Sequence, residues 1–453
     1  MPIRMLLVEA VSDNTHGENN HPPLGLTYIA SSLKREYGDE IELKIIKIFN
    51  IDEVSTFRPD IVGITSVTKN YNVAKKHARL AKQIFDLPVI IGGIHISLMP
   101  QTLTLDMDVG VAGEGEITIV ELMASFIKNN GFDKAELAGI DGVIYREGIK
   151  LKVTKPRQFI TDIDTIAYPA RDLIEIDKHA SMLTSRGCPF NCAFCSTSRY
   201  TGNRARYASA QYVADEIELI YRQYKVEYIT IYDDLFVIDI NRVSDIIDIL
   251  REKGLLGKIQ FAVNIRADFI TEELAELLKR MNVAAVGLGI ETGCQETLDY
   301  LKSGGITVED NAKAIKILRK HKIRPYCVFI LGSPCEDKAA MMQTVKFIKD
   351  NRVEFFDINI LTPYPGTPVW DYAETRGLVS GDMDWSKLDF KLNSNPLLLS
   401  EKMSAEELVS VYELLERRKH RYQIKRRILK IIKHPDIYIK AYIRAVIERI
   451  ECH

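Results

Sequence analysis

The first 140 residues alternate between short apolar runs and longer stretches with helical spacing. The apolar runs are rich in β-branched residues and lie at 5–8, 41–46, 61–65, 89–91 and 109–112. Between them, apolar positions recur every three to four residues at 24–37, 71–85 and 117–128. Strands that alternate with helices are typical of a doubly wound parallel sheet. We therefore predict an α/β, Rossmann-like domain over residues 1–140.

A second region with the same alternation begins near residue 176. We expect strands at 182–185, 228–232, 260–263, 285–290, 326–331 and 356–361, with helical stretches between them. Six such units predict a partial (βα)6 barrel of the TIM type over residues 176–375. The segment 141–175 is interpreted as a linker that carries a hairpin around Glu147 and Gly148. Residues 376–453 are predicted to form a helical, basic tail.

Length and composition are those of an ordinary α/β enzyme. A chain of 453 residues has room for two or three domains. The formal net charge of −2 gives no reason to expect a nucleic acid partner. Seven cysteines, three of them clustered, do not form a disulfide framework and favour a reducing cytoplasm. The apolar run at the start is too short for a signal peptide, and no stretch has the roughly 20 apolar residues of a membrane span.

The candidate chemistry is concentrated in one loop after the first expected barrel strand. Cys188, Cys192 and Cys195 lie within eight residues. Three thiols this close favour a metal centre, although a zinc knuckle or a chance cluster stays open at this point. Zinc usually takes four protein ligands, and no second cysteine pair follows here. A four-iron cluster held by three thiolates keeps one iron open for a substrate or cosubstrate.

This loop resembles the signature of the radical S-adenosylmethionine (SAM) enzymes. Its spacing is C-x3-C-x2-C, with the aromatic Phe194 before the last cysteine. The resemblance implies a 4Fe-4S cluster whose open iron chelates SAM, and an electron donor such as flavodoxin or ferredoxin. It also implies reductive cleavage of SAM to a 5'-deoxyadenosyl radical.

Polar residues follow the expected barrel strands, where barrel enzymes keep their catalytic groups. They are Asp233, Asp234, Asn264, Arg266 and Glu291. A guanidinium can pair with the carboxylate of SAM, and carboxylates can accept from its amino group or ribose. By resemblance, we expect Arg266 and Glu291 to contact SAM and Phe194 to frame the adenine. The alternative for each of these polar residues is a structural ion pair, most of all for the two aspartates.

Small and polar residues also follow three strands of the N-terminal domain. They are Thr65, Ser66, Gly92, Gly93, Gly113, Glu114 and Gly115. Taken with His-Pro-Pro-Leu-Gly-Leu at 21–26, they resemble the cobalamin-binding domain that precedes the barrel in one radical SAM subfamily. Alternatively, these residues form only tight turns, and the domain binds no corrin. The Asp-x-His-x-x-Gly motif is absent, and His95 is expected to be a loop or wall residue rather than a cobalt ligand.

The tail and the remaining cysteines carry weaker signals. Cys327 is expected to be core, whereas Cys294 and Cys335 lie just past strand ends. From residue 417 the tail is strongly basic with interleaved isoleucines, which is typical of a helix at an anionic membrane surface. A solvated helix packed on the barrel is the alternative. Our hypothesis is peripheral membrane contact in the service of a small, lipid-like substrate.

The residues and the resemblance together predict a radical SAM enzyme with a cobalamin-binding domain. The resemblance implies methylation of an unactivated carbon by way of methylcobalamin as the first choice of reaction. Cyclisation, oxidation or elimination without a corrin methyl donor is the alternative within the family. A metal-binding regulatory protein without catalytic activity is the alternative from another class. The sequence does not name the substrate.

Overall fold

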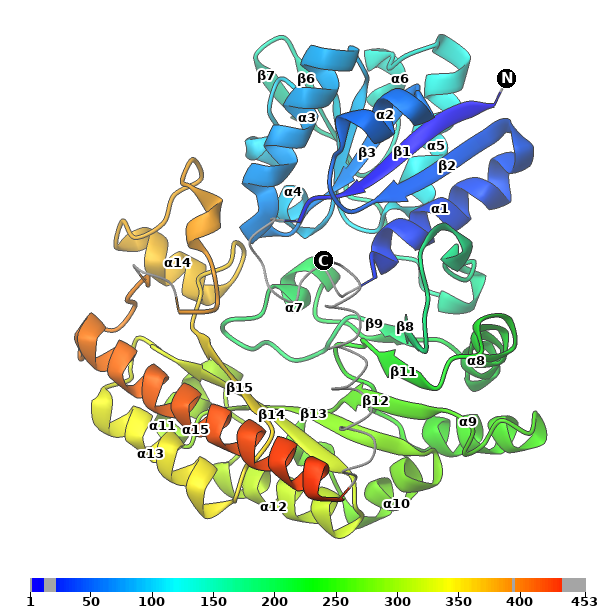
Figure 1. The fold of residues 1–453 in the computed structure, drawn as a ribbon. Helices are drawn as coiled ribbons and strands as arrows, with labels where there is room; N and C mark the ends of the chain where they lie inside the picture. Colours follow the sequence, from blue (N-terminus) through cyan, green and yellow to red (C-terminus); the bar gives the residue numbers. More distant parts are fainter. Residues whose placement is uncertain (1, 12–21, 393–395, 434–453) are drawn as a thin grey trace, which may run out of the picture.

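A computed structural model describes residues 2–11, 22–392 and 396–433 (Figure 1). Two α/β units lie one above the other in this view, and the short helix α7 (Ser196–Thr201) lies between them. The upper unit contains the N-terminal strands, and the lower one contains the later strands and the long helix α15. The predicted α/β class with two successive sheets is therefore correct.

The N-terminal sheet has the strand order β2-β1-β3-β4-β5-β6-β7, and the pairs among β1 to β5 are parallel. These strands are β1 (Ile3–Glu9), β2 (Ile41–Ile46), β3 (Ile61–Thr65), β4 (Val89–Gly92) and β5 (Val109–Val111). The helices are α1 (Leu24–Tyr37), α2 (Ile51–Phe57), α3 (Tyr71–Phe85), α4 (Ile94–Leu98), α5 (Gly115–Asn129) and α6 (Lys134–Leu137).

Each face of this sheet has its own hydrophobic core, because alternate strand residues point to opposite sides. Leu6 of β1 packs with residues of α3, whereas Met5 packs with residues of α1 and α5. Both faces are thus covered by helices, which is the doubly wound arrangement. The carboxyl ends of the strands meet at the edge that faces the second unit (Figure 1).

The predicted hairpin exists, but its placement in a linker was wrong. Strands β6 (Val143–Glu147) and β7 (Lys150–Val153) pair antiparallel, and β6 also pairs antiparallel with β5. Val143, Ile144 and Tyr145 are buried. The hairpin therefore extends the N-terminal sheet, because its apolar residues complete the two cores of that sheet.

The second sheet is a curved, all-parallel sheet with the order β15-β14-β13-β12-β11-β8. Its strands are β8 (His179–Met182), β11 (Tyr228–Ile231), β12 (Gln260–Asn264), β13 (Val283–Glu291), β14 (Arg324–Leu331) and β15 (Phe356–Ile360). The connecting helices are α8 (Ala210–Tyr224), α9 (Ile240–Glu252), α10 (Glu272–Arg280), α11 (Gln295–Lys302), α12 (Val308–Lys320) and α13 (Lys338–Asp350). Six parallel strands covered by helices on the outside make the predicted partial barrel.

The first barrel strand ends earlier than expected. It is 179–182 rather than 182–185, because its pairing with β11 runs from His179 to Met182. Residues Ser185–Arg186 instead form β9, which pairs antiparallel with β10 (Arg206–Tyr207). The cysteine loop and α7 are held between these two short strands.

The C-terminal region, predicted as a helical, basic tail, contains a non-helical segment before its long helix. After α14 (Pro368–Thr375), the chain passes back to the N-terminal unit. Trp385 stacks on Trp370 at 5.9 Å and meets the edge of His95 at 4.6 Å. Helix α15 (Ala405–Lys433) then packs on the barrel through Leu408 and neighbouring apolar residues. In the described residues no helix is long and apolar enough to cross a membrane.

Candidate active site

The three cysteines lie in the loop between β9 and α7, and all are half-buried. Burial raises the pKa of the Cys188 thiol to about 11, and it raises that of Cys192 as well. Both thiols interact electrostatically with Cys195. Burial thus favours the protonated thiols, and binding of a metal centre would displace these protons.

The number of thiols distinguishes a structural zinc site, which usually takes four protein ligands, from a four-iron cluster. Four thiolates around one zinc stand roughly 3.8 Å apart, from Zn–S bonds of about 2.3 Å. Among the described residues, no three His, Cys, Asp or Glu side chains converge closely enough to hold a single ion. A four-iron cluster takes one thiolate on each of three irons and so spreads its ligands more widely. The donor set fits such a cluster.

The end of α11 holds the cysteine loop from the other side. The backbone amide of Ala193 donates to the carbonyl of Leu301 at 2.9 Å, and the Ser303 hydroxyl donates to the carbonyl of Asn191 at 2.6 Å. Lys302, the residue between these two anchors, lies next to Cys192. The loop is thus held by hydrogen bonds at Asn191 and Ala193, on either side of Cys192.

Glu291 is buried and already has a cationic partner. Its carboxylate lies 2.7 Å from the ammonium group of Lys302. Burial opposes the charge on Lys302, but Glu291 and Cys192 raise its pKa above the ordinary value. Glu291 also has a positive φ of 62°, at a register shift between β13 and β14. A contact between Glu291 and SAM stays a prediction, and any such contact is shared with Lys302.

Sequence reasoning missed Lys302. It ends an amphipathic helix in which a lysine is normally solvent-exposed, so its spacing gives no sign of burial. The available signal is the strand before it, since Glu291 needs a nearby cation once it is buried.

Arg266 has a free position for an anion. Its Nε donates to Asp268 at 2.9 Å, and its guanidinium lies over the Phe190 ring at 4.1 Å from the centroid. The Nη1 atom is buried and has no partner among the described residues. A buried guanidinium nitrogen without a partner is costly, and a carboxylate could satisfy it. This observation fits the predicted contact with the carboxylate of SAM.

The two aspartates have different roles. Asp233 is buried, and its Oδ1 accepts from the amides of Thr184 (2.6 Å) and Ser185 (3.1 Å) while Oδ2 accepts from the Thr184 hydroxyl (2.5 Å). Burial raises the pKa of Asp233 to about 6. Asp233 therefore fastens the turn between β8 and β9, and its contact with SAM stays a prediction. Asp234 accepts from the Thr197 hydroxyl at 3.2 Å and lines a cavity beside the loop.

Two further predicted contacts keep their places near the barrel mouth. Asn264 is exposed at the end of β12, and its amide donates to the carbonyl of Asp233 at 3.4 Å. Phe194 packs at the edge of the core formed by the N-terminal unit and α14. A role for either residue in holding SAM stays a prediction.

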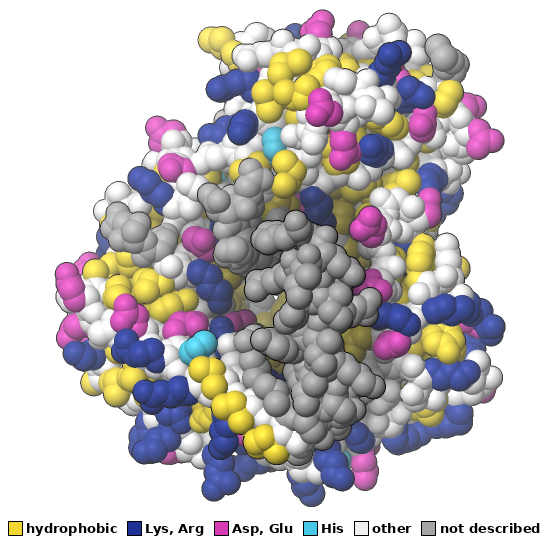
Figure 2. All heavy atoms as spheres, viewed as in Figure 1, with side chains coloured by type: hydrophobic (Ala, Val, Ile, Leu, Met, Phe, Trp, Pro, Cys, Tyr) yellow, Lys and Arg dark blue, Asp and Glu magenta, His cyan; other side chains and the backbone are white. Residues whose placement is uncertain are grey.

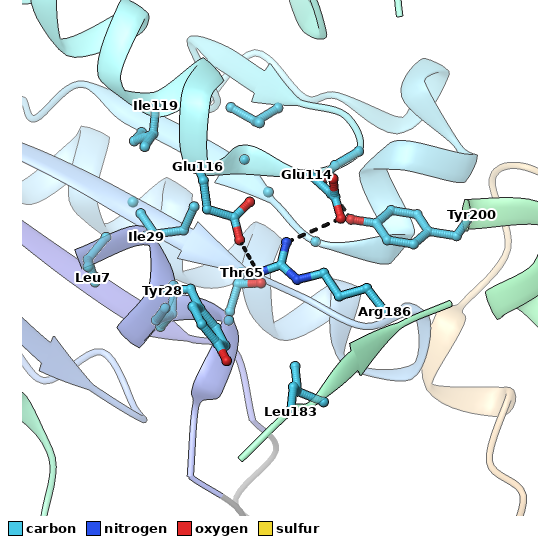
Figure 3. A pocket seen from close by; sticks show the side chains of 18 of the residues that line it. Leu7, Tyr28, Ile29, Thr65, Glu114, Glu116, Ile119, Leu183, Arg186 and Tyr200 are labelled. Carbon is cyan, nitrogen blue, oxygen red and sulfur yellow. Dashed lines mark hydrogen bonds and ion pairs between the residues drawn. The ribbon is translucent and has the colours of Figure 1, made fainter. Parts of the chain in front are cut away.

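A cavity of about 380 Å³ lies between the N-terminal sheet and the cysteine loop (Figure 3). Its N-terminal wall is mainly apolar, with Leu7 and Ile29 among its residues, and Thr65 adds a hydroxyl to the lining. The other wall comes from the barrel unit and includes Gly187 and Thr197. The cavity thus reaches from the sheet of the first unit to the residues that flank the cysteine loop in the second.

Glycines leave the N-terminal side of this cavity open. A Cβ atom added to Gly25, Gly92 or Gly113 would meet no atom within 4 Å. All three glycines line the cavity, so side chains there would project into free space. These glycines form a cradle with room for part of a large ligand, as the corrin prediction requires.

The other predicted contacts of this cradle divide into two groups. Gly93, Glu114 and Gly115 line the cavity with Thr65. Ser66 is buried, and its hydroxyl donates to the carbonyl of Val67 at 2.8 Å. The Ser66 hydroxyl is therefore engaged in the turn, and a role in ligand binding is not supported.

His95 is neither a loop nor a wall residue. It lies in α4, is fully buried and packs against the Tyr71 ring at 3.9 Å between centroids. Burial lowers the pKa of His95 to about 3, so the ring is neutral at physiological pH. The conclusion that it is no cobalt ligand agrees with this position.

Glu114, Glu116 and Arg186 line the cavity (Figure 3). With Arg206 they form an interdomain ion-pair cluster. Glu114 lies 2.7 Å from Arg206 and 3.2 Å from Arg186, and Glu116 lies 2.5 Å from Arg186. Burial opposes the charge of Glu114, but the two arginines hold its pKa below the ordinary value. Because Glu114 is engaged in this way, its contact with a cofactor stays a prediction.

Comparison with known proteins agrees with this division into two units. A B12 binding domain model matches residues 14–123, and a radical SAM superfamily model matches residues 182–348. An uncharacterized methyltransferase of Pyrococcus horikoshii is 31% identical over 94% of this chain and 93% of its own length. The chain belongs to the cobalamin-binding radical SAM family. Its cofactors are a 4Fe-4S cluster, SAM and cobalamin.

More distant members of the family are also similar. An anaerobic magnesium-protoporphyrin IX monomethyl ester cyclase of Rubrivivax gelatinosus is 27% identical over 86% of this chain and 72% of its own length. The hopanoid C-3 methylase of Methylococcus capsulatus is 25% identical over 90% and 79%. The structure of the radical SAM methyltransferase TsrM from Kitasatospora setae, with tryptophan and a SAM analogue bound, shares the fold. Its TM-score is 0.67 at 21% identity, covering 82% of this chain and 76% of that one.

The remaining cysteines lie outside the cysteine loop. Cys327 is fully buried in β14, as predicted for a core residue, and burial raises its pKa to about 12. Cys294 is buried at the start of α11, and Cys335 is half-buried beside Thr297. A catalytic role for Cys294 or Cys335 has no support from their contacts.

Proposed function

We propose that this family member methylates an unactivated carbon of an apolar, lipid-like small molecule. The observation that carries the proposal is the shared cavity, in which the glycine cradle of the N-terminal sheet and the stem of the cysteine loop line one space. When bound, the cluster and SAM supply a 5'-deoxyadenosyl radical, and cobalamin supplies the methyl group. A one-electron donor such as flavodoxin or ferredoxin would serve the cluster.

The residues of this chain have distinct tasks in the proposal. Cys188, Cys192 and Cys195 hold the cluster. The free Nη1 of Arg266 binds the carboxylate of SAM. Lys302 pairs with the buried carboxylate of Glu291 at 2.7 Å. Together these groups fix the cosubstrate on the barrel side of the cavity.

The reaction can be tested with the anaerobically reconstituted protein and SAM that carries a trideuterated methyl group. We expect retention of corrin in the visible spectrum, 5'-deoxyadenosine under strong reductant, and a labelled methyl group in a lipid extract of the source cells. A protein that retains no corrin would contradict the methylation proposal. A protein that retains the iron-sulfur cluster and cobalamin but cannot cleave SAM would contradict enzymatic radical chemistry altogether.

Ring closure is the second candidate, because the Rubrivivax gelatinosus relative is named a cyclase. The two reactions differ in the product mass. Methylation with the labelled SAM adds a CD3 group, whereas cyclisation incorporates no label. A product without label that still requires 5'-deoxyadenosine formation would select the second candidate.

The lipid-like substrate class is supported by the end of α15. Its exposed apolar side chains are Ile424, Ile428, Leu429 and Ile432, which are 43–68% exposed. They follow one helix face at i, i+4 and i+8, and the exposed Arg421 and Lys425 accompany them. Figure 2 shows this row of hydrophobic side chains among Lys and Arg residues. A basic amphipathic face of this kind suits an anionic membrane surface.

Liposome co-sedimentation tests this contact on the full chain. We expect the triple variant Ile424→Ser, Ile428→Ser and Ile432→Ser to pellet less on anionic vesicles than the wild type. The matched control replaces Leu105 and Ile149, two exposed apolar residues of the N-terminal unit, by Ser. Equal and negligible pelleting of all forms would rule out the membrane contact and leave the methylation proposal intact.

A further inference from the structure

Arg186 belongs to the barrel unit but makes its main contacts with the N-terminal unit. It lies in β9, two residues before Cys188, and points away from the barrel toward the start of α5 (Figure 3). Its guanidinium lies 2.5 Å from Glu116, 3.2 Å from Glu114 and 5.0 Å from the centroid of the Tyr28 ring. The carboxylates and the guanidinium are largely buried, so solvent screens these contacts little.

The chain after the cysteine loop is fastened to the same segment. Arg206 of β10 lies 2.7 Å from Glu114. The Tyr200 hydroxyl of α7 donates to the carbonyl of Gly113 at 2.7 Å. Both ends of the cysteine loop are therefore anchored to residues 113–116 of the N-terminal unit.

The connection from Arg186 to the first cysteine has little freedom. Gly187 has a φ of +88°, and a Cβ atom there would lie 2.2 Å from the carbonyl oxygen of Arg204. The backbone is thus held in a conformation that only glycine adopts easily. A displacement of Arg186 would therefore move Cys188 directly.

Residues 113–116 also form part of the cavity wall. Gly113, Glu114 and Glu116 thus line the cavity and also hold the two ends of the cysteine loop. We propose that the interdomain ion-pair cluster couples occupancy of the cavity to assembly of the iron-sulfur cluster. The proposal rests on the proposed function, in that cobalamin is the ligand of the cavity.

Such coupling is reciprocal, because two ligands that favour the same arrangement of one segment favour each other's binding. Cobalamin in the cavity would hold residues 113–116 and, through Arg186, the loop. An assembled cluster would hold the loop and, through Arg186, residues 113–116. Couplings of this kind typically change affinity about 5- to 150-fold.

The test measures the affinity for hydroxocobalamin by equilibrium dialysis, with the cluster reconstituted and after its removal by a chelator. We expect the cluster to tighten cobalamin binding about tenfold in the wild type. Glu116→Gln should still bind cobalamin, but the ratio of the two affinities should fall to near one. The matched control is Glu121→Gln, because Glu121 also lies on α5 and pairs with Arg157 away from the cysteine loop.

The outcomes separate the two proposals. A wild type that binds no cobalamin would overturn the proposed function and the coupling with it. The coupling alone would be overturned if the ratio of cobalamin affinities with and without the cluster were the same in wild type and Glu116→Gln. A wild-type ratio of one would overturn it as well. Arg186→Lys is the second variant, since it keeps the charge but cannot reach both carboxylates in the same way. Its ratio should lie between those of wild type and Glu116→Gln.

Discussion

Replacing Asp233 by Asn tests whether this carboxylate is structural or a ligand of SAM. Oδ1 of Asp233 accepts both backbone amides of the turn, whereas Oδ2 contacts only the Thr184 hydroxyl. The amide oxygen of Asn can keep the first two hydrogen bonds. Its NH2 group can donate to the Thr184 hydroxyl oxygen, because a hydroxyl both donates and accepts. The substitution therefore removes a buried charge without removing a contact.

The sign of the effect follows from the pKa of Asp233, which burial raises from 3.8 to about 6. The folded protein binds this proton more tightly than the unfolded chain does. Stability from this group is therefore complete below pH 3.8 and is lost as the pH rises through about 6. About two pKa units correspond to about 3 kcal/mol at pH 8. Asp233→Asn should be more stable than the wild type by up to that amount at pH 8, and the gain should shrink toward pH 4.

Urea unfolding of the cofactor-free protein at several pH values measures this difference, since other titrating groups are common to both forms. Asp233→Ala is the matched variant, because it leaves the amides of Thr184 and Ser185 without an acceptor. It should lose about 2–6 kcal/mol, from about 1–3 kcal/mol for each buried unsatisfied group. An Asn variant with an unchanged pH profile and at least tenfold weaker SAM binding would refute the structural role.

Three further substitutions test the rest of the site. Gly92→Leu should fill the cradle and weaken cobalamin binding at least about tenfold in equilibrium dialysis, a loss of about 1.4 kcal/mol, whereas Gly139→Leu at an exposed turn should not. Arg266→Met should weaken SAM binding about 10- to 100-fold, as expected for loss of a charged hydrogen bond, with cobalamin affinity unchanged. Cys327→Ala should lower stability by about 1 kcal/mol in urea unfolding and leave the iron content of the reconstituted protein unchanged.

The fold could be predicted from the sequence where the periodicity of apolar residues and the length of the segment indicated the same element. The helix at 24–37 and the strands at 41–46 and 61–65 have the bounds that their patterns indicate. The first barrel strand was misplaced, because the apolar run continues to Leu183, whereas pairing with β11 ends at Met182. The hairpin at 143–153 was assigned to a linker, because its pairing with β5 is a long-range contact that local pattern does not report.

Some features of the candidate site could likewise be predicted from the sequence, and others could not. The spacing of Cys188, Cys192 and Cys195 is local, so it could be read directly. The interdomain ion-pair cluster joins residues far apart in the chain, and the ion pair between Glu291 and Lys302 joins the end of a strand to the end of the next helix. The sequence pattern marks Glu291 as a candidate functional residue but does not show which cation it contacts. It also does not distinguish a buried structural aspartate, such as Asp233, from an aspartate that binds a ligand.

The contact between Trp385 and His95 bears on how this enzyme could be recombined with its relatives. Because the chain returns to the N-terminal unit after the barrel, the core around α4 is completed by residues that follow the barrel in sequence. A cobalamin-binding unit exchanged at a single junction near residue 150 would carry the histidine but leave its aromatic partner behind. A functional chimera therefore requires two junctions, so that the donor protein supplies both the N-terminal sheet and the returning segment around residue 385.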